Sequence, residues 1–71
     1  MKLRVTFDRS ANAAYIYLKE IEPGAAIRQE LCDESGTIIL DFDQHDRLIG
    51  IEVLDATRRL PLNVIHGAER L

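Results

Sequence analysis

Apolar and polar residues alternate along two runs that flank a short polar segment, residues 43–47. In the first run, Ile38, Leu40 and Phe42 share one face, because strand side chains point alternately to opposite sides of a sheet. In the second run, both faces carry apolar groups, which indicates a strand that is covered on part of each side. The pattern predicts a central β-hairpin with strands at residues 37–43 and 47–54.

The polar segment can close this hairpin in two ways, which differ in register. A two-residue loop at residues 45–46 would place Phe42 opposite Ile49. A type I turn with a bulge would use residues 44–46 and would hold Asp46 at positive φ. We expect the bulged form.

Two glycines add to this picture. Residues 33–36 have the same offsets as the hairpin loop and end on Gly36, which suits a second bulged turn. Gly50 lies inside a predicted strand and marks either a bulge or a close approach by another element.

Three more strands are predicted, at residues 2–7, 13–19 and 25–33. Ser10 and the alanines after it could instead begin a helix over residues 10–21. We expect a strand there, because Tyr15-Ile16-Tyr17 is rich in β-forming side chains. This strand would pair with the first one as a hairpin.

The C-terminal part predicts one or two short helical pieces that fold over the sheet. Asp55 can cap the first piece, and Arg58 and Arg59 lie near its negative end. Pro61 ends that turn or begins a second one. The predicted fold is therefore α+β: a single domain, residues 1–71, with an antiparallel sheet of about five strands in meander order and a short C-terminal helical segment.

Charge and composition exclude several classes of protein. The formal net charge is −3, and the basic residues form no cluster larger than Arg58-Arg59, which argues against binding to nucleic acid. The chain has neither a signal-peptide pattern nor a long apolar run, so we expect no membrane association and a cytoplasmic location. Its one cysteine cannot form an internal disulfide.

One group of residues suggests metal chemistry. Asp41, Asp43, His45 and Glu52 fall at positions one, three, five and twelve of a calcium-loop template. The template needs Gly at position six, where this chain has Asp46, and it needs flanking helices. We therefore interpret these groups as structural or solvated carboxylates and expect no cofactor. The alternative is a small metal-dependent enzyme or ligand-binding domain that uses this hairpin.

Glu52 lies between apolar residues of a strand, where an unpaired carboxylate is costly to bury. We expect it either to form a salt bridge, for which Arg4, Arg28 and Arg58 are available, or to accept a backbone hydrogen bond. This role is structural, so no catalytic residue is predicted.

Cys32 could act as a nucleophile only beside a base such as His45 or His66. Nothing in the sequence places these residues together, and a single cysteine with two histidines at these spacings does not make a structural zinc site. We expect Cys32 to be a small buried apolar group.

Several pieces of the chain resemble the small prokaryotic family called domain of unknown function 2283. They are residues 8–16, residues 39–43 and residues 48–56, and Gly50-Ile51-Glu52 is the most specific part. The chain departs from the family pattern at two places: the family usually has Gly where this chain has Asp46, and Asp where it has Asn12. The resemblance implies a compact sheet-based domain without an established activity, similar in size to antitoxin-like proteins.

These observations predict a non-enzymatic protein-interaction module rather than an enzyme. It would bind a second copy of itself, as in a homodimer, or another small protein. The candidate contact residues are an aromatic pair on the sheet and apolar residues of the tail, namely Tyr15, Tyr17, Leu62 and Ile65.

Overall fold

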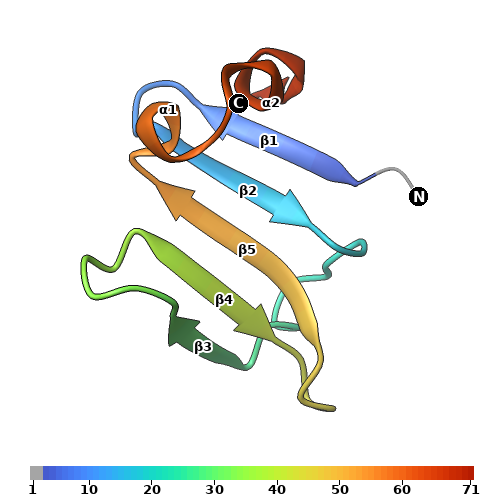
Figure 1. The fold of residues 1–71 in the computed structure, drawn as a ribbon. Coiled ribbons are helices and arrows are strands. Elements are labelled where there is room, and N and C mark those ends of the chain that lie inside the picture. Colours follow the sequence, from blue (N-terminus) through green and yellow to red (C-terminus); the bar gives the residue numbers. More distant parts are fainter. Residues whose placement is uncertain (1–2) are drawn as a thin grey trace.

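The computed structural model describes residues 3–71, which form one six-stranded sheet with two short helices against one of its faces (Figure 1). The strands are β1 Arg4–Asp8, β2 Ala13–Tyr17, β3 Arg28–Leu31, β4 Ile38–Phe42, β5 Leu48–Leu54 and β6 Glu69–Arg70. The helices are α1 Ala56–Arg59 and α2 Leu62–Gly67. The α+β class and the short C-terminal helices are confirmed.

The order of strands across the sheet is β3-β4-β5-β2-β1-β6, so the prediction of a five-stranded antiparallel meander is wrong. The connection after β2 carries the chain to the far edge, where β3 pairs with β4, and β2 pairs instead with β5. The sheet is also mixed, because β6 pairs in parallel with β1. Apolar side chains match across the β2–β5 pair, where Ala14 lies opposite Val53 and Ile16 opposite Ile51.

The predicted bulged turn at residues 44–46 is present, whereas the loop at residues 33–36 shows the predicted positive φ at Gly36 without a register shift between β3 and β4. Asp46 has φ of 61°, and the Asp43 N–H donates to the Arg47 carbonyl at 3.0 Å. Phe42 therefore pairs with Leu48, with a register shift between Asp41 and Phe42. The loop before β4 ends on Gly36 with φ of 71°.

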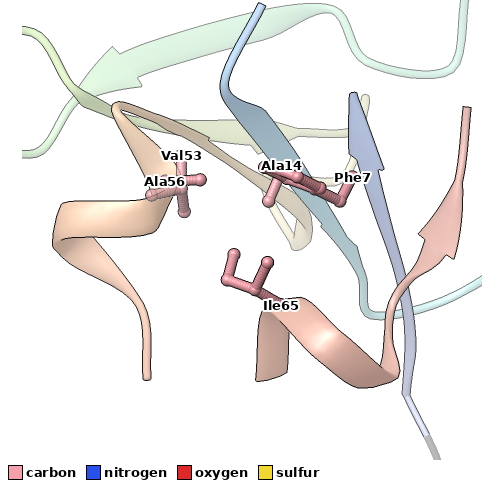
Figure 2. Packing of buried hydrophobic residues seen from close by; sticks show 5 residues of the cluster. All are labelled: Phe7, Ala14, Val53, Ala56 and Ile65. Atoms are coloured by element: carbon pink, nitrogen blue, oxygen red, sulfur yellow. The ribbon is translucent and has the colours of Figure 1, made fainter. Parts of the chain in front are cut away.

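The core lies between the helices and strands β1, β2 and β5. Its buried members are Phe7, Ala14, Val53, Ala56 and Ile65. In Figure 2, Ile65 points from α2 toward Phe7, Ala14 and Val53 of the sheet, and Ala56 of α1 lies beside them. The predicted packing of the tail over the sheet is therefore correct, and it fixes which sheet face remains for other contacts.

The sequence predicts Asp55 as the cap of helix α1, and this prediction is wrong. The capping groups come from a turn that is distant in the sequence. Asp55 precedes the helix at φ of 54° and makes no side-chain cap hydrogen bond. The backbone carbonyl of Asn12 accepts from the Ala56 N–H at 3.0 Å, and its side-chain oxygen accepts from the Thr57 N–H at 3.1 Å. Asn12 thus joins the β1–β2 turn to the start of α1.

Candidate functional site

The sheet face opposite the helices carries the polar residues that could form a site. Ala14 and Ile16 face the helices, so Tyr15 and Tyr17 project from the other side of β2. Asp41 and Glu52 share that side, which we call the tyrosine face: Tyr15, Tyr17, Gln29, Asp41 and Glu52. It draws on four neighbouring strands.

A hydrogen-bonded bridge crosses this face. The Tyr15 hydroxyl donates to Asp41 Oδ2 at 2.6 Å, and Gln29 Nε2 donates to Asp41 Oδ1 at 2.7 Å. Asp41 is 5 % exposed, so both carboxylate oxygens are bonded in a site almost closed to water. The bridge links β2 to β4 over β5, and β4 to β3.

Gly50 makes room for the Tyr15 ring. It lies on β5 next to Tyr17, and a Cβ atom there would come within 2.0 Å of the Tyr15 hydroxyl oxygen. Of the two alternatives predicted for Gly50, a bulge or a close approach, the structure shows the close approach. The side chain that approaches belongs to the neighbouring strand.

Burial raises the pKa of Tyr15 well above its ordinary value, and the hydrogen bond to Asp41 raises it further. The hydroxyl therefore keeps its proton at neutral pH and acts as a donor. A neutral phenol whose proton is already directed at a buried carboxylate is poorly suited to act as a base. The bridge is arranged to hold strands together.

An open groove of about 400 Å³ lies beside the two tyrosines, and residues 21–24 and Ala26 of the β2–β3 connection complete its lining. The Tyr15 and Tyr17 rings meet edge to face, with their centroids 4.6 Å apart. The Arg4 guanidinium lies 4.7 Å from the Tyr17 ring centroid. The tyrosines thus pack on their neighbours as sheet cover.

The four residues of the calcium-loop template do not act together. Asp41 is held by the bridge, whereas Asp43 accepts the backbone N–H groups of His45 at 2.9 Å and Arg47 at 3.0 Å. These backbone bonds lower the pKa of Asp43. Within residues 3–71, no group of three or more His, Cys, Asp or Glu side chains is arranged to hold a metal ion.

Within residues 3–71, the predicted ion pair of Glu52 is not found. Glu52 is half-buried on β5, between Tyr15 of β2 and Ile39 of β4. The three candidate arginines pair with other carboxylates: Arg4 with Glu69, Arg28 with Glu30 and Asp46, and Arg58 with Asp55. The sequence indicated the need for a partner but could not show that each arginine has a nearer one.

Cys32 is exposed, so the expectation that it is a small buried group is wrong. It lies opposite Ile38 at one end of β4, whereas His45 is in the turn beyond the other end. His66 is exposed on α2. The fold therefore places neither histidine beside Cys32, so neither can act as its base.

The four candidate contact residues do not form one surface. Tyr15 and Tyr17 lie on the tyrosine face, whereas Leu62 belongs to α2 on the opposite side and is 61 % exposed. Ile65 is a core residue with 4 % exposure, so it is not available for contact. The sequence showed that Ile65 is apolar but not which way α2 would turn it.

The β3 edge, residues 27–31, is the exposed apolar surface that sequence reasoning missed. Ile27 is 64 % exposed and Leu31 is 68 % exposed, at either end of an outer strand. Every residue of β3 is exposed. Two large apolar residues separated by polar and charged ones were the signal in the sequence that could have found this edge.

In the part of the chain that the structure describes, neither helix has the length and apolar character needed to cross a membrane. A search of curated proteins and a search of solved structures each return no significant match. A scan against family models matches residues 4–56 to the model of the family described as protein of unknown function (DUF2283). The match covers β1 to β5, including the tyrosine bridge and Gly50. This chain is therefore a member of the DUF2283 family.

Proposed function

We propose that this protein is a non-enzymatic interaction module that binds a second copy of itself or another small protein, as an antitoxin-like neutraliser would. The observation that carries the proposal is the β3 edge. Large apolar side chains are normally withdrawn from water in a small domain, and here Ile27 and Leu31 remain mostly exposed on an outer strand.

The disposition of the acidic side chains also supports this proposal. Asp8, Asp33 and Asp43 accept hydrogen bonds from neighbouring backbone N–H groups in three turns, and Asp41 is held in the tyrosine bridge. These carboxylates fix the shapes of loops and the order of strands. Their bonds support a structural role in place of a reactive one.

An outer strand also offers a way to bind a protein. Its outward N–H and C=O groups can pair with a strand of another chain, and alternate side chains then select the partner. The other outer strand, β6, has only two residues and offers much less. Binding is therefore expected at β3.

The test compares a double variant, Ile27→Lys with Leu31→Lys, with a control, Leu62→Lys, which adds a lysine at a similarly exposed leucine on α2. We expect the wild type and the control to self-associate in sedimentation experiments or to retain one stoichiometric partner in affinity capture. The double variant should lose that association while keeping its circular dichroism spectrum. A wild-type protein that stays monomeric and captures no partner would refute the proposal.

A further inference from the structure

The β3 edge has a charge pattern that complements itself in one register. We propose that β3 pairs antiparallel with β3 of a second copy, about a two-fold axis at Gln29, so that two six-stranded sheets become one continuous sheet. This inference rests on the proposed function and names the partner. Its basis is the order of charges along Arg28-Gln29-Glu30 together with the direction of the backbone groups.

The backbone of Gln29 faces away from the sheet. The Cys32 N–H donates to the Ile38 carbonyl at 2.8 Å, in register with the four β3–β4 pairs. Hydrogen bonds alternate along an antiparallel strand, so Arg28 and Glu30 also bond toward β4. The N–H and C=O of Gln29 therefore point outward, where they can exchange two hydrogen bonds with Gln29 of another copy.

Charge selects this register from its neighbours. With the axis at Gln29, Arg28 of each copy lies opposite Glu30 of the other, twice in the dimer. With the axis one residue later, Glu30 would face Glu30, and like charges directly opposite are destabilising. The Gln29 register also places the pairs at positions without backbone bonds, where cross-strand side chains are closest.

Arg28 is already ordered for this contact. Its guanidinium lies 4.1 Å from the Phe42 ring centroid and bonds to Glu30 and Asp46. A side chain held by its own fold loses less conformational freedom when it meets a partner. In the dimer, Glu30 of the second copy would join this ion-pair network.

The apolar ends of the β3 edge are covered in the same register. The Ile27 N–H donates inward to the Phe42 carbonyl at 2.9 Å, so backbone pairing between the copies does not extend to Ile27. The Leu31 side chain of one copy comes beside Ile27 of the other without a backbone bond there, and the two-fold axis repeats this contact. The edge is short, so the buried area falls below that of a standard protein interface. We therefore expect a weak dimer, with Kd on the order of 10 µM to 1 mM.

Charge reversal tests the register. Glu30→Arg would place Arg28 against arginine, and Arg28→Glu would place Glu30 against glutamate. Each variant alone should self-associate at least about tenfold more weakly than the wild type. An equimolar mixture should form a heterodimer, and the double variant R28E/E30R should form a homodimer again. Sedimentation velocity from about 10 µM to about 1 mM protein measures the association of the two single variants, their mixture and the double variant.

Two controls match the changes in net charge. Glu20→Arg and Arg9→Glu lie at exposed positions outside the β3 edge and should associate as the wild type does. Circular dichroism checks that every variant is folded. Arg28→Glu could unfold the protein, because Phe42 would lose the guanidinium that packs on its ring. In that case Glu30→Arg alone tests the register, and undiminished self-association of that variant would overturn the inference.

The outcomes separate this inference from the broader proposal. A wild type that is monomeric at about 1 mM overturns the β3 dimer. The interaction-module proposal survives that result if a stoichiometric partner is captured and is lost in the Ile27→Lys, Leu31→Lys variant. Two weakened charge variants whose mixture forms no heterodimer also overturn the Gln29 register.

Discussion

At the scale of single residues, the chain uses its polar groups to fix geometry. Asp41 illustrates this: it is buried, yet both oxygens are bonded by side chains from two other strands. Asp46 has a different role, since it adopts positive φ in the bulged turn. Glycine has no steric cost at positive φ, and aspartate adopts it more readily than most other residues. Of these two residues, Asp41 had suggested metal chemistry from its spacing, whereas Asp46 stands where the calcium-loop template needs glycine.

The bridge across the tyrosine face predicts a specific loss of stability. Tyr15→Phe removes the hydroxyl that donates to Asp41, so we expect the free energy of unfolding, measured in urea, to fall by about 1–2 kcal/mol. Tyr17→Phe is the control, because the Tyr17 hydroxyl makes no hydrogen bond within residues 3–71, and it should change stability by less than about 0.5 kcal/mol. Equal effects of the two substitutions would contradict the structural role of the bridge.

The turn carboxylates predict how stability depends on acid. Hydrogen bonds from the Ser35 and Thr37 hydroxyls lower the pKa of Asp33 in the folded protein. Below an unfolded-state pKa of about 4, the unfolded chain therefore binds more protons, and the free energy of unfolding falls as the pH falls. In urea titrations between about pH 5 and pH 2, Asp33→Asn should flatten this dependence.

The control for this titration is Glu34→Gln, a neutral substitution at the exposed neighbouring position. Its stability should follow the wild-type pH dependence. If Asp33→Asn showed the same steepness as the wild type, the hydrogen bonds to Asp33 would not be responsible for the acid sensitivity.

At the scale of elements, the local patterns and the packing of the tail over the sheet were predicted correctly, and the order of the strands was not. The strand at Tyr15-Ile16-Tyr17 and the bulged turn at Asp46 depend on side-chain alternation and turn geometry, which neighbouring residues determine. The pairing of β2 with β5 depends on where the connection after β2 takes the chain. The two-residue strand β6 is too short for any periodic pattern to show.

The cap of α1 is another long-range contact, and it can be measured. Asn12 has φ of 49°, so Asn12→Gly keeps the turn conformation while it removes the side chain that accepts from Thr57. We expect a loss of about 1 kcal/mol in thermal or urea unfolding, because the side-chain hydrogen bonds to Thr57 are removed. Asn12→Ala should lose more, because alanine is also strained at positive φ.

The comparison for the cap is Asp55→Asn, since Asp55 precedes α1 without making a side-chain cap bond. The new Asn side chain keeps an oxygen that can accept from Asn12 Nδ2, as Asp55 Oδ1 does at 3.4 Å. Its exposed ion pair with Arg58 contributes little, so the change should stay within about 0.5 kcal/mol. A larger loss at Asp55 than at Asn12 would show that the cap had been assigned to the wrong residue.

At the scale of the whole molecule, the two outer strands differ. One edge ends in β6, which has only two residues, and α2 lies immediately before it in the chain. The other edge ends in β3, which is exposed along its length and has β4 as its one partner within residues 3–71 (Figure 1). A chain of this size gains stability when it buries further apolar surface. The open edge at β3 is where the fold allows this.

Hydrogen exchange at the Gln29 amide tests the central claim most directly, since it needs no substitution. The Glu30 amide faces β4 and should stay protected at every protein concentration. If β3 pairs with β3 of a second copy, protection at Gln29 should rise between about 10 µM and about 1 mM protein. Exchange at Gln29 that remained fast and unchanged over that range would contradict the account.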